Sequence, residues 1–126
     1  MKRLIFTLGL FVVTLTICIA ETVFLNNTVY SFMQEIENAV QETIDENTET
    51  AMQLSSNISE RWQKEQIFMS TFINHSRLEE IDQSILSMKT NISNDQIEDF
   101  YVYSEIAKSQ LNHLRDTELP LIQNIF

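Results

Sequence analysis

Two histidines, His75 and His113, are the only side chains in this sequence whose ordinary pKa lies near neutral pH. A carboxylate follows each of them, Glu79 in the first case and Asp116 in the second. Imidazole and carboxylate groups are common zinc ligands, so these residues could hold a metal ion. The pattern is weak, because the histidines lack cysteines and tight ligand spacing. We therefore expect both to be structural residues near helix ends, and we predict no cofactor.

Other common forms of catalysis find no support in the sequence. Its single glycine lies in an N-terminal apolar run, so a glycine-rich phosphate loop cannot form. No nucleophile and base stand in a recognisable arrangement. The net charge of −10 also argues against nucleic acid as a partner, since affinity for phosphate comes mainly from clustered cations. The sequence predicts that the protein is not an enzyme.

The large aromatic side chains offer a second kind of candidate site. Trp62, Phe68 and Phe72 could line a ligand cavity, but their helical spacing is more typical of a bundle core. The acidic residues between positions 79 and 82 could bind a cation, although acids at a helix N-terminus also complement the helix dipole. The candidate interaction or structural residues are Trp62, Phe72, His75, His113 and Phe126.

The N-terminal segment bears on where the protein lies. Residues 4–20 carry no charge, and they lie between Lys2-Arg3 and Glu21. As a helix they would span about 26 Å, close to the hydrocarbon core of a bilayer, which is about 30 Å thick. Cations precede the run, and none follows it until Arg61, which predicts a cytoplasmic N-terminus and an extracytoplasmic body. We therefore predict a single-pass cell-membrane protein with its anchor over residues 1–25.

Two kinds of processing compete with an intact anchor. Lipidation at Cys18 is not expected, because Ile17 is bulky where a small residue is needed. Cleavage after Ala20 would release a secreted body, and Cys18 and Ala20 are acceptable at the cleavage site. The apolar run is longer than the roughly 7–15 residues of a signal peptide, which favours an uncleaved anchor.

The rest of the sequence predicts an all-α protein. One glycine and one proline in 126 residues leave little for sheets and hairpins. Apolar residues recur at steps of three and four in four segments, separated by polar residues at 45–50, 74–76 and 94–95. Short connections make neighbouring helices antiparallel, so residues 26–118 should form an up-down four-helix bundle, followed by an apolar C-terminal tail at 119–126. The predicted core residues are Val29, Met33, Ile36, Val40 and Ile44, then Leu54, Ile58, Trp62, Met69 and Phe72, then Leu78, Ile81, Ile85, Met88 and Ile92, and last Ile97, Phe100, Tyr101, Ala107, Leu111 and Leu114.

The turns also predict which residues face one another. If the last two helices fold back on each other about Asn94, the residue numbers of facing positions add up to about 188. This register places His75 opposite His113. With neighbouring helix axes about 8–10 Å apart, we expect their Cα atoms within roughly 12 Å of each other, at the membrane-proximal end. The first two helices should place Met33 opposite Trp62. We expect His75 to close the second helix and Ser76 with Glu79 to form a capping box for the third.

Several phrases in the second half of the sequence belong together: Trp62…Phe72-Ile73-Asn74-His75, Ile81-Asp82…Ser84-Ile85…Met88-Lys89, Leu111-Asn112-His113-Leu114, and Glu118 with Asn124-Ile125-Phe126. In these phrases the sequence resembles a bacterial family of unknown function, numbered four-three-six-three. The family more often has Asp than Asn at the position of Asn74. The resemblance implies an anchored helical protein outside the cytoplasm, no known activity, and another integral membrane protein as partner.

The leading prediction is a membrane-anchored, extracytoplasmic helical bundle that serves as an accessory or protein-interaction module of a membrane complex. One alternative is a sensory ligand-binding ectodomain, because an anchor followed by four helices also resembles the ligand-binding half of bacterial chemoreceptors. Those receptors have a second membrane span, which we do not find in this sequence. A less favoured alternative is a metal-binding protein that uses His75 and His113.

Overall fold

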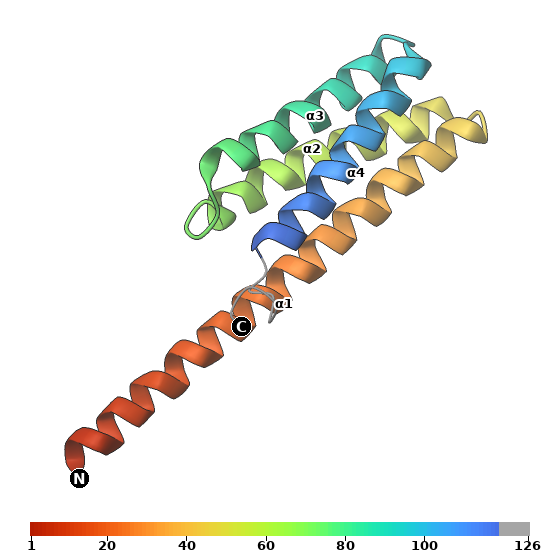
Figure 1. Cartoon of the computed structure of the whole chain (residues 1–126). Helices are drawn as coiled ribbons and strands as arrows, with labels where there is room; N and C mark the ends of the chain where they lie inside the picture. Colours follow the sequence, from red (N-terminus) through yellow and green to blue (C-terminus); the bar gives the residue numbers. More distant parts are fainter. Residues whose placement is uncertain (119–126) are drawn as a thin grey trace.

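The computed structural model describes residues 1–118, and within them the chain forms four α-helices and no strand. The helices are α1 (Lys2–Ile44), α2 (Thr48–Met69), α3 (His75–Ser93) and α4 (Ile97–Glu118) (Figure 1). The predicted all-α class is therefore confirmed. The predicted apolar tail, with Phe126, lies outside the described residues.

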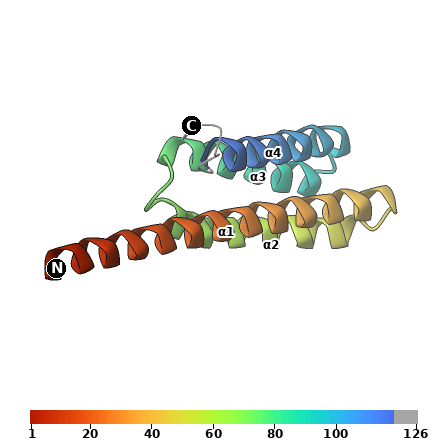
Figure 2. The same ribbon diagram turned by 60° about the horizontal axis from the view of Figure 1, so that its bottom comes forward.

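The four helices form an antiparallel up-down bundle. α1 packs beside α2 and α4, and α3 also packs beside α2 and α4. Figure 2 shows one layer made by α1 and α2 and a second layer made by α3 and α4. The N-terminal part of α1 projects out of the bundle as a bare helical shaft, while its C-terminal part belongs to the core (Figures 1 and 2). This is the predicted architecture of an apolar N-terminal helix that continues into a four-helix bundle.

Each helix presents one apolar stripe to the centre of the bundle. The buried positions alternate steps of three and four residues, the pattern of helices packed at small crossing angles. In α3 the prediction is confirmed at every position. Buried residues along the four helices include Leu25, Val29, Phe32, Ile36, Ala39 and Thr43, then Ala51, Ser55, Ile58, Trp62 and Met69, then Leu78, Ile81, Ile85, Met88 and Ile92, and last Phe100, Ser104, Ala107, Leu111 and Leu114.

The stripe of α1 differs from the predicted one by a small rotation of the helix. Phe32 is buried where Met33 was expected, and Met33 is only half-buried. Ile44, another predicted core residue, is exposed. The reason is that α1 has two neighbours, α2 and α4, so its buried face points between them.

Hydroxyl groups enter this core without losing their hydrogen bonds. Ser55 Oγ donates to the carbonyl of Ala51 at 2.8 Å, and Ser104 Oγ donates to that of Phe100 at 2.7 Å. Thr43 Oγ1 donates in the same way within α1, at 3.0 Å. Each hydroxyl is satisfied by its own helix, so its burial avoids the cost of an unpaired polar group.

The turns at the far end of the bundle are built without glycine. Glu46, between α1 and α2, has φ of 66°, and Asp95, between α3 and α4, has φ of 61°. A helix often ends with a residue in this left-handed region, where glycine is preferred. The only glycine in the sequence is Gly9, so acidic residues take this conformation instead.

The side-chain contacts correct the predicted registers. Phe32, rather than Met33, faces Trp62, with ring centroids 5.2 Å apart. Between α3 and α4, Arg77 Nη1 donates to Thr117 Oγ1 at 2.7 Å. Ser84 Oγ donates to Gln110 Oε1 at 2.6 Å.

In both of these α3–α4 pairs the residue numbers add up to 194 rather than 188. The predicted register was therefore off by six residues, or about 9 Å of helix. The error has two causes. The turn is centred nearer Asp95 than Asn94, since α3 ends at Ser93 and α4 begins at Ile97. In addition, long side chains such as that of Arg77 reach along the helix axis.

Candidate functional site

His75 lies at the start of α3, not at the end of α2 where it was predicted. Asn74 is the N-cap, and its Oδ1 accepts from Ser76 N at 3.0 Å and from Ser76 Oγ at 2.9 Å. Glu79 pairs with His75 Nε2 at 2.9 Å instead of completing a capping box with Ser76. Both side chains of this pair are exposed, and exposed ion pairs contribute little to stability.

His113 lies on α4 and is exposed, in a different environment from His75. It lines a pocket between α3 and α4 together with Arg77, Glu80 and Gln110. Its carbonyl accepts from Thr117 Oγ1 at 2.8 Å. The two histidines thus have different neighbours, and the observed register removes the reason for expecting them to face each other.

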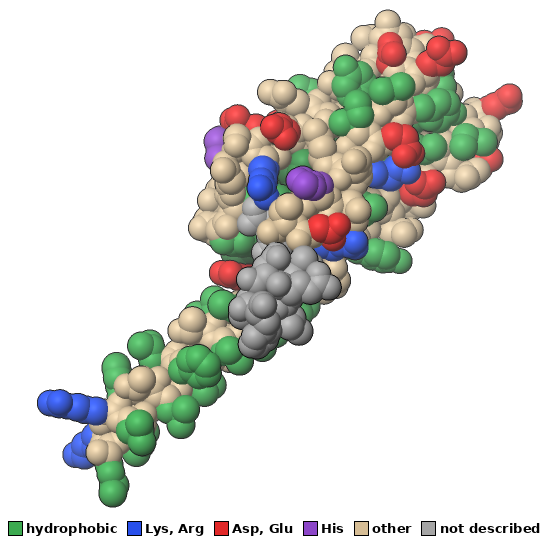
Figure 3. Space-filling model, in the orientation of Figure 1, with side chains coloured by type: hydrophobic (Ala, Val, Ile, Leu, Met, Phe, Trp, Pro, Cys, Tyr) green, Lys and Arg blue, Asp and Glu red, His purple; other side chains and the backbone are tan. Residues whose placement is uncertain are grey.

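The carboxylates near the histidines do not complete a metal site in the part of the chain that the structure describes. Among residues 1–118, no group of three or more His, Cys, Asp and Glu side chains is placed to hold a metal ion. The metal-binding alternative therefore gains no support from the geometry around His75 and His113. Figure 3 shows both histidine side chains on the outer surface of the bundle.

Trp62 is a core residue. Its indole is completely buried and packs edge-to-face on Phe32. The guanidinium of Arg61 lies 4.2 Å from the centroid of the Phe32 ring and pairs with Glu35 at 2.7 Å, so α1 and α2 are joined at this level by aromatic and ionic contacts. Trp62 Nε1 finds no hydrogen-bond partner among the described residues.

Asp82 on α3 is a half-buried residue with one buried carboxylate oxygen that lacks a partner in the described chain. Its Oδ1 has no hydrogen-bond partner within residues 1–118. Burial, and then the nearby charge of Glu79, raise the pKa of Asp82 above its ordinary value. The ionised carboxylate is therefore less stable in the folded protein than in water.

Replacing Asp82 with Asn is expected to stabilise the protein at neutral pH. The folded state binds the Asp82 proton more tightly than the unfolded state, because the pKa is raised. Ionising Asp82 therefore costs more free energy in the folded state than in the unfolded state. This cost is present above the raised pKa, and it is lost as the pH falls through that pKa to the ordinary value. We expect Asp82→Asn to gain less than about 1 kcal/mol, because the carboxyl is only partly buried and solvent weakens the penalty on its charge.

Urea denaturation of the two proteins at neutral pH, and again below the ordinary Asp pKa of 3.8, measures this effect. The gain should vanish at the lower pH. An Asn variant that is less stable than the parent at neutral pH would contradict the interpretation of Asp82.

Phe72 belongs to an aromatic cluster at the end of the bundle from which the bare part of α1 projects. The rings of Phe68 and Phe72 lie 5.8 Å apart, and Phe68 packs on Phe24 of α1 at 4.9 Å. Phe72 is half-buried, and Phe68 is exposed. The sequence pattern indicated Phe68 and Phe72 but missed Phe24, which we had assigned to the anchor.

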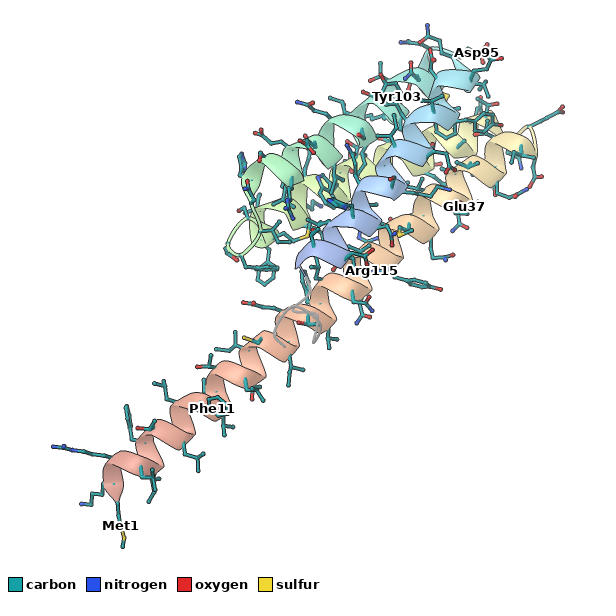
Figure 4. The ribbon with its side chains drawn as sticks, in the orientation of Figure 1. Met1, Phe11, Glu37, Asp95, Tyr103 and Arg115 are labelled. Carbon is teal, nitrogen blue, oxygen red and sulfur yellow. The ribbon has the colours of Figure 1, made fainter. Side chains whose placement is uncertain are left out.

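Lys108 is a structural residue that the sequence pattern did not reveal. Its Nζ lies 2.6 Å from Glu37 of α1 and 2.7 Å from Glu105 of its own helix. Burial acts to lower the pKa of Lys108, but hydrogen bonds to the two carboxylates outweigh burial and raise it. Figure 4 shows Glu37 on α1 beside α4, so this contact ties the two helices together.

The projecting part of α1 is apolar on all sides. In the described chain, one helix is long and apolar enough to cross a membrane; it is α1, and its most apolar stretch of 18 residues is entirely unburied. Figure 3 shows apolar side chains along the visible face of the shaft, and Phe11, labelled in Figure 4, is 62% exposed. A helix that is apolar all round is typical of a protein interior or a membrane span.

The threonines of this shaft keep their hydroxyl groups paired. Thr7, Thr14, Thr16 and Thr22 each donate to the carbonyl four residues earlier, at 2.8–2.9 Å. A polar group that lies in hydrocarbon needs an internal partner, because no water is available there. The shaft therefore meets the hydrogen-bonding requirement of a membrane span with its own backbone.

These features define a helical-bundle protein with one apolar helix long enough to span a membrane. The model of the family described as "Domain of unknown function (DUF4363)" matches residues 19–125, and the chain belongs to this family. The predicted family is thereby confirmed. Searches among curated proteins and among solved structures found no match.

Proposed function

We propose that the chain is a single-pass membrane protein whose bundle lies outside the cytoplasm and acts as an interaction module for another integral membrane protein. The observation that carries this proposal is the continuity of α1, which joins the bare apolar shaft to the bundle core in one helix. No flexible linker separates the two parts, so the bundle keeps a fixed position at the membrane surface. Such preorganisation lowers the entropy that is lost when a membrane partner binds.

The charges at the N-terminus support the proposed orientation. Lys2 and Arg3 precede the shaft, and the next cation in the sequence is Arg61. Cationic residues are retained on the cytoplasmic side of a membrane, which favours a cytoplasmic N-terminus.

An uncleaved anchor also fits the local structure. Cleavage after Ala20 would divide α1, which is one continuous helix from Lys2 to Ile44. Leu25, five residues further on, is already part of the bundle core.

A surface on α3 and α4 supports a role in protein binding rather than catalysis. Val102 and Ile106 are exposed one helical turn apart on α4, and Leu86 is exposed on α3. Acidic residues Glu98 and Glu105 lie on the same helix as Val102. Exposed apolar groups within a charged surface are typical of protein interfaces, so we propose a partner with complementary apolar and basic groups and no enzymatic activity for this chain.

Site-specific photocrosslinking in cells tests the proposal. A photoreactive residue in place of Val102 or Ile106 should give a discrete adduct with an integral membrane protein. The control places the same residue at Thr50, which is exposed at the start of α2. The proposed interaction would be wrong if positions 102 and 106 gave no more adduct than position 50, or gave adducts with soluble proteins alone.

A further inference from the structure

We infer that the base of the bundle lies in the lipid interface on the bundle side of the membrane. This inference rests on the proposed anchor, because only an anchored chain brings the base of the bundle to the lipid. The surface concerned, called here the basal apolar surface, consists of Phe24, Phe68 and Phe72.

The length of α1 places this surface at the level of the membrane boundary. A helix crosses about 30 Å of hydrocarbon in roughly 20 residues. Counted from Leu4, the first uncharged residue after the cations, the crossing ends near Val23, so Glu21 lies in its last turn, at the interface. Phe24 follows directly, and Phe68 packs on it with ring centroids 4.9 Å apart. The aromatic cluster therefore stands where the helix leaves the hydrocarbon.

The exposure of the basal apolar surface is high for its side-chain types. Phe68 is 56% exposed, although it is a large apolar side chain and packs on Phe24. Exposed apolar groups that cluster together mark sites of association. Contact with the membrane interface would remove these side chains from water, and no rearrangement of the bundle is needed.

The backbone at the end of α2 is suited to contact with lipid. The last carbonyls of a helix lack partners within the helix and would be left unpaired in an apolar environment. Here Ser70 Oγ donates to the carbonyl of Ile67 at 2.7 Å. Thr71 Oγ1 donates to the carbonyl of Phe68 at 2.8 Å. The carbonyl of Phe68 also accepts from Thr71 N at 3.2 Å, and that of Met69 accepts from Ile73 N at 2.9 Å. Side chains and the backbone of the following turn thus pair carbonyls that would otherwise need water.

A lysine lies beside the basal apolar surface. Lys64 lines a shallow hollow with Phe24, Glu65 and Phe68. Glu65 contacts Arg61 at 3.6 Å, whereas Lys64 forms no ion pair within the described part of the chain. Its long side chain can lie along the apolar surface and bring the ammonium group to a lipid phosphate.

Tryptophan quenching in the full-length chain tests the contact. The protein is reconstituted in phosphatidylcholine vesicles, with or without bromine on the acyl chains, in a Trp62→Phe background that removes the native indole. One variant carries Phe68→Trp. Two controls carry Val12→Trp in the shaft and Ile44→Trp at the far end, and the three replaced residues are similarly exposed, at 56%, 55% and 58%. We expect brominated lipid to reduce the emission at positions 68 and 12, but not at position 44.

Each other outcome has a definite meaning. Quenching at position 12 without quenching at position 68 would overturn the lipid contact and leave the anchor intact. An unquenched but blue-shifted emission at position 68 would show that protein covers the surface, and would also overturn the contact. Absence of quenching at position 12 would refute the proposed anchor itself, and the inference with it.

Discussion

Replacing Trp62 with Ala is expected to lower the free energy of unfolding by about 3–5 kcal/mol, the usual range for removing a fully buried large aromatic side chain. The indole is completely buried, and it fills the space between its own helix, α2, and Phe32 of α1. A small domain has a total stability of about 5–15 kcal/mol, so this single change removes a large part of it. Denaturation of the full chain in detergent, followed by circular dichroism, measures the loss.

Trp62→Phe is the matched control. It keeps a ring against Phe32, and it removes an indole N–H that finds no hydrogen-bond partner among residues 1–118. The cost of lost volume is partly offset, because a buried unpaired donor costs about 1–3 kcal/mol. We expect Trp62→Phe to retain most of the stability that Trp62→Ala loses. Equal losses in the two variants would indicate that Nε1 does have a partner, such as a buried water molecule.

The helical pattern predicted the core of α3 fully and the core of α1 only in part. In α1 the choice between adjacent residues was ambiguous, because Ala39 and Val40 are both apolar. Hydrophobicity alone favours Val40 and Ile44, yet Ala39 and Thr43 are the buried pair. In α1, burial depends on whether a side chain points between the two neighbouring helices, α2 and α4. Thr43 is tolerated because its hydroxyl donates to its own helix.

The candidate histidine pair shows the limit of predicting contacts from turns. The predicted turn near Asn94 is present. The register also depends on the residue at which the turn is centred and on how far long side chains reach along the helix axis. A shift of six residues in register removes the basis for placing His75 directly opposite His113. In the same way, the contact of Lys108 with Glu37 joins α1 and α4, which are distant in sequence. Helical periodicity carries no information about such a pair.

Removal of the anchor is expected to change the protein from fully membrane-bound to fully soluble. The full chain should stay with the membrane through an alkaline wash, since its shaft exposes about 26 Å of apolar helix between Leu4 and Ala20. A chain that begins at Glu21 should be soluble and helical, because the buried residues of α1 begin at Leu25. Fractionation followed by circular dichroism of the soluble chain tests both statements.

A chain that begins at Met33 is the control that separates the anchor from the bundle. It also lacks the shaft, but it loses Leu25, Val29 and Phe32 from the core. Each buried large apolar residue contributes about 2–5 kcal/mol, so this shorter chain should not fold. A full-length chain that alkaline washing releases would contradict the anchor. Recovery from cells of a mature protein beginning at Glu21 would show instead that the shaft is a cleaved signal peptide, and the bundle would then act away from the membrane.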